Sequence, residues 1–453
     1  MLKTSQTFHT LPKEFIFGVA TAAYQIEGAA EIDGRGPSIW DAFSQTKGKV
    51  KNNDTGQVAC DHYHLWESDL DLIKTLNVDA YRFSFSWPRI QPDGTGAINE
   101  KGLAFYDRLI DGCLERSLQP YATLYHWDLP LALQHAGGWT HRDTAKAFAD
   151  FAELITRRYG DRLASIATFN EPWCSSMLGY LYGVHAPGIK DLAQTLKAVH
   201  HQHLAHGLAV ERIKNVKPSL PTGIVLNLQS IYPGSDSHED EQASVRHEIF
   251  NNGIFLNPLF RGDYPKPFIE ELGQHLPDEW EADLSTINQP LDFWGLNYYT
   301  PERVQNNLNK DADYPRTMKA PAKAGIDRTD IGWEIDASAF QDLLIDVYAK
   351  YTLPPCYITE NGACFNEGPE DGVVNDAKRQ QYLEQHIDAV ANACATGIPV
   401  RGYFAWSLMD NFEWAEGYAM RFGLVHVDYD TQVRTTKESG KWYANLALSH
   451  RSD

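Results

Sequence analysis

The chain has 453 residues and a formal net charge of −20, with 60 acidic side chains against 40 Lys and Arg, and it contains 12 Trp and 22 Tyr. An acidic chain without a basic run is not expected to bind nucleic acid or anionic lipid, and it disfavours phosphorylated substrates unless a local basic pocket overrules the average. No apolar stretch reaches the roughly 18 residues that indicate a membrane-spanning helix, so we expect neither a membrane nor a nucleic acid as partner.

Eight short apolar or aromatic runs recur along the chain, each followed by a longer stretch. The runs cover 14–28, 79–89, 119–128, 165–172, 221–229, 292–300, 354–362 and 400–414. Several of the stretches between them repeat apolar residues every three or four positions, which predicts helices. The clearest of these predicted helices cover 68–77, 100–117, 142–160, 191–215 and 376–397. Strands that alternate with helices indicate a parallel sheet, so we predict an α/β fold: one (β/α)8 TIM barrel domain over 1–453, with long βα loops.

Two features bear on the cellular compartment. Residues 15–23, FIFGVATAA, are similar to a short signal-peptide core that ends in small residues. They follow Lys13-Glu14 instead of a basic segment and continue directly into Tyr24-Gln25-Ile26-Glu27, so we interpret them as the first strand. The cysteines form no CxxC pair, which is typical of reduced thiols, and we predict a cytoplasmic protein. They lie at positions 60, 113, 174, 356, 364 and 394.

Each predicted strand begins apolar and ends in polar or aromatic side chains. These side chains are Gln25, Arg82, His126-Trp127, Asn170-Glu171, Asn227, Asn297 with Tyr299, Glu360-Asn361, and Trp406. In a parallel barrel all C-terminal strand tips converge on one face, and such barrels carry their catalytic groups there. We therefore expect these side chains to form one site.

Two of these strand ends carry glutamates beside asparagines. Glu171 closes TFNE and is followed by a proline, which cannot continue a strand ladder, and Glu360 closes CYITE. The fourth and seventh strands lie on opposite sides of the barrel mouth, so the two carboxylates should face each other. Two facing carboxylates are sufficient to split an acetal. One protonates the leaving oxygen, and the other attacks the anomeric carbon or activates water. The alternative is a pair of acids at the starts of the following helices.

The motifs TFNEP and ITENG, together with QIEG near the N-terminus and NFEWAEGY near the end, resemble family 1 glycoside hydrolases, the β-glucosidase group. The resemblance runs from FIFGVATAAYQIEG to RFGLVHVDYD and covers nearly the whole chain. It implies a retaining β-glucosidase that releases terminal β-D-glucosyl residues from cello-oligosaccharides, as in cellulose degradation, and from aryl or alkyl β-glucosides. It also implies side activity on β-galactosides and β-fucosides, and transglycosylation. We expect a small-molecule β-glycoside as partner, no metal and no cofactor; a monomer and a homo-oligomer are both compatible with the sequence.

The resemblance also implies a role for each site residue. Glu171 matches the general acid/base and Glu360 the nucleophile of a double displacement through a covalent glycosyl-enzyme. Arg82 and Tyr299 match positions that hydrogen-bond the nucleophile and keep it ionised, and Asn170 matches the residue that binds the sugar 2-hydroxyl. The other positions matched to the sugar are Gln25, His126, Asn297, Glu413 and Trp414, with Trp406 as the platform under the ring. Leaving-group contacts are matched by Trp173, Asn227 and Trp333.

Two other functions are compatible with parts of this pattern. A 6-phospho-β-glycosidase of this family carries a Ser-containing segment with added Lys and Tyr in the last loop, whereas this chain reads SLMDNFEWAEGY, and Glu413 would repel a 6-phosphate. A non-catalytic sugar-binding barrel would have lost one of the two glutamates, and both are present.

A zinc site is the competing interpretation of the histidine-rich segment HHQHLAH. His200, His203 and His206 fall near one face of a predicted helix, which is a spacing that fits zinc. No HExxH motif or cysteine pair stands nearby, so we interpret these residues as neutral histidines packed against the barrel.

Overall fold

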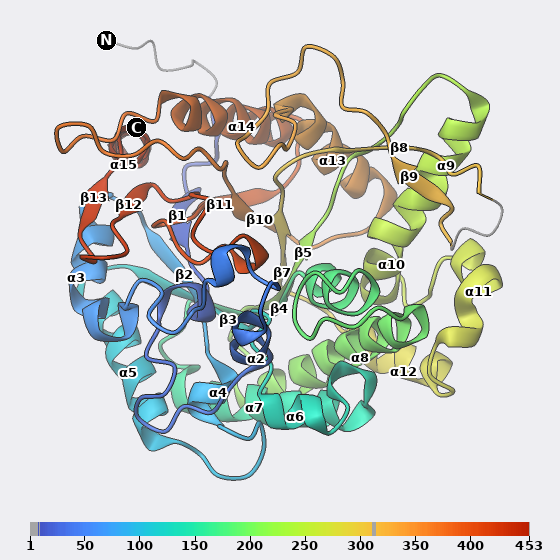
Figure 1. Ribbon diagram of the computed structural model, residues 1–453, viewed down its shortest axis with the longest axis horizontal. Coiled ribbons are helices and arrows are strands. Elements are labelled where there is room, and N and C mark those ends of the chain that lie inside the picture. Colours follow the sequence, from blue (N-terminus) through green and yellow to red (C-terminus); the bar gives the residue numbers. More distant parts are fainter. Residues whose placement is uncertain (1–7, 9, 310–313, 453) are drawn as a thin grey trace.

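A computed structural model describes residues 8, 10–309 and 314–452, and its centre is a closed barrel of eight parallel strands (Figure 1). Around the barrel the strands follow the order β1-β11-β10-β7-β5-β4-β3-β2. They are β1 (Ile16–Ala20), β2 (Ala80–Ser84), β3 (Gln119–Tyr125), β4 (Ser165–Asn170), β5 (Thr222–Asn227), β7 (Phe293–Asn297), β10 (Cys356–Asn361) and β11 (Val400–Trp406). Each predicted run contains one of these strands, so the predicted (β/α)8 barrel is confirmed. The stretch 15–23, interpreted as the first strand, contains β1, and its last residue, Ala23, begins a short helix.

The five predicted helices are all present around the barrel (Figure 1). They are α3 (His62–Thr75), α5 (Glu100–Glu115), α7 (Arg142–Tyr159), α8 (Leu192–Val216) and α14 (Ala377–Ala395). α3 begins before the predicted residue 68, and a hydrogen bond of 2.8 Å between the buried His62 and Asp69 ties this earlier turn to the rest of the helix. The other α-helices of the described residues are α1 (Ala23–Ile26), α2 (Ile39–Gln45), α4 (Trp87–Ile90), α6 (Leu131–His135), α9 (His238–Glu248), α10 (Ile254–Phe260), α11 (Lys266–Leu272), α12 (Trp280–Ile287), α13 (Ala337–Lys350) and α15 (Glu438–Ser452).

Smaller sheets lie in the loops of the barrel. β6 (Ile231–Pro233), β8 (Glu302–Asn306) and β9 (Thr317–Lys319) form one sheet, and β12 (Val425–Val427) pairs with β13 (Arg434–Thr436). β6 follows β5 and β8 follows β7, so the first sheet extends the loops beyond two neighbouring barrel strands. It includes part of the polar stretch 301–330, whose residues 310–313 lie outside the described ones. Within the described residues, no helix has the length and apolar character needed to cross a membrane.

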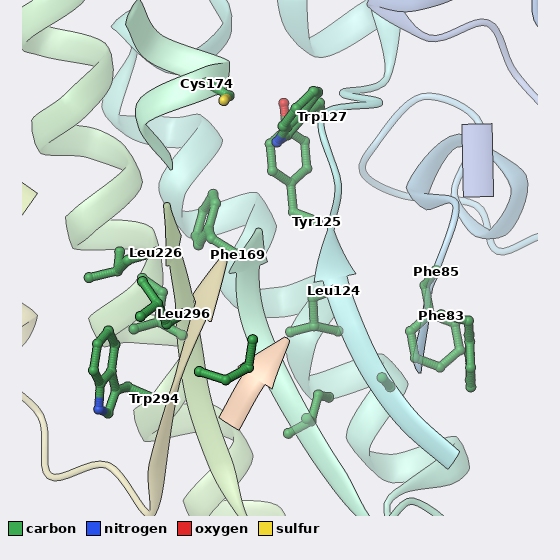
Figure 2. Close-up of a cluster of buried hydrophobic side chains, with 14 of the residues drawn as sticks. Phe83, Phe85, Leu124, Tyr125, Trp127, Phe169, Cys174, Leu226, Trp294 and Leu296 are labelled. Atoms are coloured by element: carbon green, nitrogen blue, oxygen red, sulfur yellow. The ribbon is translucent and has the colours of Figure 1, made fainter. Parts of the chain in front are cut away.

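Apolar side chains pack on both faces of the barrel strands, which explains why the strand sequences read as nearly continuous apolar runs. On the outer face Phe83 stacks on a tyrosine of α5 and Trp294 bonds a tyrosine of α13, and Figure 2 shows part of this layer. Inside the barrel, the Tyr121 ring lies 5.0 Å from Phe404, and Tyr357 contacts both Tyr121 and Phe293. Toward the C-terminal ends the inward positions become polar.

Candidate active site

A cavity of about 460 Å³ opens at the C-terminal ends of the barrel strands. It brings together most of the predicted site residues, which are His126, Glu171, Trp173, Asn227, Asn297, Tyr299, Trp333, Glu360, Trp406, Glu413 and Trp414. The other three, Gln25, Arg82 and Asn170, are buried. Arg82 bonds Glu360 and Asn170 bonds His126, whereas Gln25 bonds Asn411 and the carbonyl of Phe412, next to Glu413. The convergence of strand ends that the sequence predicts is therefore observed.

The backbone holds both glutamates in special positions. Glu171 has a φ of 49°, in the left-handed region, and its N–H bonds the carbonyl of Val225 in β5 at 2.9 Å. A side chain at such a φ costs about 1–2 kcal/mol, and this kind of strain gathers at functional sites. Beside Glu360, a Cβ on Gly362 would lie 1.8 Å from the carbonyl oxygen of Trp406, so only glycine lets the end of β10 approach β11 this closely.

Glu360 is bound on both carboxylate oxygens. Arg82 Nη1 donates to Oε1 at 2.6 Å, and the Tyr299 hydroxyl donates to Oε2 at 2.7 Å. Burial raises the pKa of Glu360 above its ordinary value, while the Arg82 charge and the Tyr299 hydrogen bond oppose that shift. The positive charge of Arg82 thus stabilises the ionised form of Glu360.

Among the described residues, no Lys or Arg forms an ion pair with Glu171, and its side-chain hydrogen bonds come from neutral groups. Its Oε1 accepts a hydrogen bond of 2.5 Å from Asn297 Nδ2, and its Oε2 accepts one of 2.9 Å from the Cys174 thiol. Burial, followed by the negative charge of Glu360, raises the pKa of Glu171 to about 7. Of two carboxyls in one cavity, Glu171 is therefore suited to hold a proton near neutral pH while Glu360 is ionised.

Asn170 links the surroundings of the two carboxylates. Its Oδ1 accepts from Arg82 Nη2 at 2.7 Å and from Asn297 Nδ2 at 3.0 Å. Arg82 holds Glu360 and Asn297 holds Glu171, so one amide oxygen connects both sets of bonds. Both carboxylates accept bonds from side chains at the barrel mouth, which argues against the alternative that they are merely acids at helix starts.

Several polar atoms around the cavity are buried without a hydrogen-bond partner in the part of the chain that the structure describes. They include Gln25 Oε1, His126 Nδ1, Asn227 Oδ1 and Glu413 Oε2. A buried polar atom left unpaired costs about 1–3 kcal/mol, so these atoms mark where the hydroxyls of a bound molecule would supply the missing bonds. The amide of Gln25 is fixed by bonds of 2.9 Å to Asn411 Oδ1 and to the carbonyl of Phe412.

Aromatic rings complete this half of the cavity. The His126 ring stacks on Trp406 and on Trp414, at 5.9 Å in both pairs, and burial lowers the pKa of His126 well below its ordinary value, so it is neutral. Indole faces beside unpaired hydrogen-bonding atoms suit a molecule with hydroxyl groups on its rim and an apolar face.

The remaining carboxylate of the predicted set is Glu413. Burial, with the charges of Glu360 and Glu171, raises the pKa of Glu413 to about 8. Among the described residues that line the cavity there is no Lys or Arg. A phosphate group in the cavity would therefore lie among acidic groups, and the nearest cation, Arg82, lies outside the lining and is bound to Glu360.

The contact between the Cys174 thiol and Glu171 was not predicted from the sequence. It begins the short helical segment Cys174–Leu181, three residues after Glu171, and its thiol contacts that carboxylate. A lone cysteine outside any motif has no signal of its own. Its spacing from Glu171, one helical turn, is the only sequence feature that points to the contact.

The histidines of α8 have partners within the protein. His200 bonds the Tyr264 hydroxyl at 3.1 Å and Asp283 at 3.0 Å, and His206 bonds the Thr168 hydroxyl at 2.7 Å. Burial lowers the pKa of His206 to about 3. In the described residues no group of His, Cys, Asp and Glu is arranged to hold a metal ion. The interpretation that these histidines pack against the barrel agrees with these bonds.

Comparisons with known proteins match this architecture and these motifs. The model of glycosyl hydrolase family 1 matches residues 7–452. A β-glucosidase of Agrobacterium sp. is 56% identical over 436 residues, which cover 96% of this chain and 95% of that protein. A bifunctional β-D-glucosidase/β-D-fucosidase of Bifidobacterium breve is 43% identical over 465 residues, covering 97% of this chain and 98% of that protein.

A solved structure agrees over the same length. The virulence factor SghA of Agrobacterium tumefaciens, in complex with its substrate analogue salicin, matches with a TM-score of 0.96 and 55% identity, covering 99% of this chain and 98% of that one. With the family model matched over nearly its whole length and relatives of this identity, the chain belongs to glycosyl hydrolase family 1 and is a glycoside hydrolase.

Proposed function

We propose that this enzyme is a retaining β-glucosidase in which Glu171 is the acid/base and Glu360 is the nucleophile. The observation that carries the proposal is the asymmetry of the two carboxylates in one cavity. Arg82 contacts Glu360, whereas the partners of Glu171 within the described part of the chain, Cys174 and Asn297, are neutral and its pKa is raised to about 7. One group is therefore suited to attack and the other to protonate, as a double displacement requires.

In the first step, Glu360 attacks the anomeric carbon while Glu171 gives its proton to the glycosidic oxygen, and the alcohol leaves. The negative charge of Glu360 is one of the causes that raise the pKa of Glu171, and forming the glycosyl ester removes this charge. The pKa of Glu171 should therefore fall. Glu171 then releases protons more readily and acts as base toward water, which opens the ester from the other face. Two inversions give net retention. A sugar hydroxyl that replaces this water gives transglycosylation.

The substrate follows from the two halves of the cavity. In the sugar-binding half, the unpaired polar atoms of Gln25, His126 and Glu413 can bond the hydroxyls of a terminal glucosyl unit. The half that would hold the leaving group includes Trp173 and Trp333. Salicin, the substrate analogue bound by SghA, is an aryl β-glucoside, which supports aryl leaving groups here too. We include short cello-oligosaccharides as substrates. The bifunctional relative of Bifidobacterium breve supports side activity on β-fucosides, and we extend this to β-galactosides.

The test compares initial rates on p-nitrophenyl β-glucoside and on its 6-phosphate, without added metal. We expect fast release from the plain glucoside and at least roughly 100-fold slower release from the phosphate, because the described residues that line the cavity include glutamates but no Lys or Arg. Activity only on the phosphate would make the protein a 6-phospho-β-glycosidase. Activity on neither would revive the sugar-binding barrel.

A pH profile tests the protonation states. Glu171 must carry its proton in the free enzyme, and its pKa is about 7. The value of kcat/KM should therefore be lost as pH rises through about 7, by about tenfold per pH unit beyond it. Because the two carboxylates interact, the pKa read from this basic limb of the pH profile describes the pair of carboxyl groups together. A basic limb near the ordinary range of a glutamate would contradict the assignment.

A further inference from the structure

The thiol of Cys174 is the neighbour of Glu171 that the proposed mechanism leaves without a role. Cys174 is buried, and its Sγ lies 2.9 Å from Glu171 Oε2 and 3.7 Å from Asn227 Nδ2. Figure 2 shows Cys174 beyond the tips of the strands, on the cavity side where Trp127 also lies. The thiol thus lies between the acid/base and a residue predicted to contact the leaving group.

The two oxygens of Glu171 have different partners. Oε1 faces the Asn297 amide nitrogen, whose orientation is set because Asn297 Oδ1 accepts from the Thr359 hydroxyl at 2.6 Å. An amide nitrogen only donates, so Oε1 is kept as an acceptor in both protonation states. The transferred proton must therefore sit on Oε2, the oxygen that faces Cys174.

A thiol suits an oxygen that gains and loses a proton in each turnover. It is a weak donor and a weak acceptor, so it supports the carboxylate without binding it strongly. A serine hydroxyl at the same place would make a short charge-assisted bond to the ionised form. Burial, more than the nearby Glu171 charge, raises the pKa of the Cys174 thiol well above its ordinary value, so it stays a neutral S–H group.

We propose that Cys174 is a positioning residue, which holds Oε2 of Glu171 as the proton-carrying oxygen and allows that carboxyl to exchange between its ionised and protonated forms. This inference rests on the proposed acid/base role of Glu171. Among the described residues, the charges of Glu360 and Arg82 act on this carboxyl, and the other titratable groups that line the cavity are Tyr299, Glu413, Glu416, His126 and His185. A substitution at position 174 leaves all of them in place.

The test is the pH profile of kcat/KM for Cys174→Ser and Cys174→Ala. The serine should stabilise ionised Glu171 and move the basic limb to lower pH by about one unit. The alanine removes the donor and should move the limb to higher pH. As a matched control, Cys394→Ser changes a half-buried cysteine whose thiol faces the carbonyl of Val400, and it should leave the limb unchanged.

Opposite shifts for serine and alanine would support the inference, since a merely structural role would not move the limb in two directions. If the basic limbs of both variants stay at the wild-type pH, or both move in the same direction, the inference about Cys174 is wrong. The proposed function would still stand in that case, because it is tested by hydrolysis with the wild-type enzyme. A second measurement adds Cys174→Ser to a Glu171→Ala enzyme. If the thiol acts through Glu171, the rate on an activated aryl glucoside should fall less than about twofold below that of Glu171→Ala alone. A larger fall would mean that Cys174 acts on the reaction by a way that does not involve Glu171.

Discussion

Replacing Glu360 with glycine should lower the turnover of aryl β-glucosides on the order of 10⁶-fold, the scale seen when a covalent nucleophile is removed. The fold should persist, because the side chain projects into the cavity and Arg82 keeps bonds to Asn170 Oδ1 and to the carbonyl of Thr359. Thermal melting beside the wild type checks that folding is retained, so that the loss can be assigned to chemistry.

External azide then identifies the role of Glu360. Azide fits the space left by the carboxylate and attacks the anomeric carbon from the same side, so activity should return with α-glucosyl azide as product. The wild-type enzyme under the same azide concentration is the control and should not form the α-azide. A β-azide from the Glu360→Gly enzyme would contradict the nucleophile assignment, because it would mean that a second group still displaces the leaving group first.

The barrel could be predicted from the sequence because its strands are buried on both faces. Runs such as 165–172 are mostly apolar until the strand ends in Asn170 and Glu171, so this change to strongly polar residues marks the tip. α13 was not predicted, although Asp336 caps it with a bond of 3.0 Å to the N–H of Ala339. The small sheet β6-β8-β9 could not be derived, because its short strands pair only after the barrel brings their loops together.

The candidate site was predicted as a set of side chains, and the resemblance also implied that Arg82 and Tyr299 keep Glu360 ionised. The burial that raises the pKa of Glu171 to about 7 could not be predicted. The letters of TFNEP and ITENG locate Glu171 and Glu360, whereas the asymmetry between them depends on Arg82, from β2, contacting one and not the other. The left-handed backbone of Glu171 and its thiol partner likewise depend on where the chain turns after β4. The contact between Arg82 and Glu360 joins segments far apart in the chain and leaves no pattern in one sequence, whereas the thiol contact leaves only the spacing of three residues between Glu171 and Cys174.

Replacing Glu171 with alanine should produce a loss that depends on the leaving group. For alkyl glucosides, whose leaving oxygen needs a proton, kcat/KM should fall roughly 10²- to 10⁴-fold, the usual contribution of a positioned acid. For a dinitrophenyl glucoside, whose leaving group departs without a proton, kcat/KM should change little. Its kcat should fall, because the base for the second step is missing. Equal losses on both substrates would argue against the acid role.

Azide also separates the two glutamates in this variant. With Glu360 intact, the glycosyl-enzyme still forms from the activated substrate, and azide can open it from the face that water uses without help from a base. The Glu171→Ala enzyme should therefore speed up with azide and release β-glucosyl azide, the opposite anomer to that of Glu360→Gly. An α-azide here would reverse the two roles. Because each variant predicts a different anomer from the same reagent, the pair of products assigns both carboxylates independently of how far either rate falls.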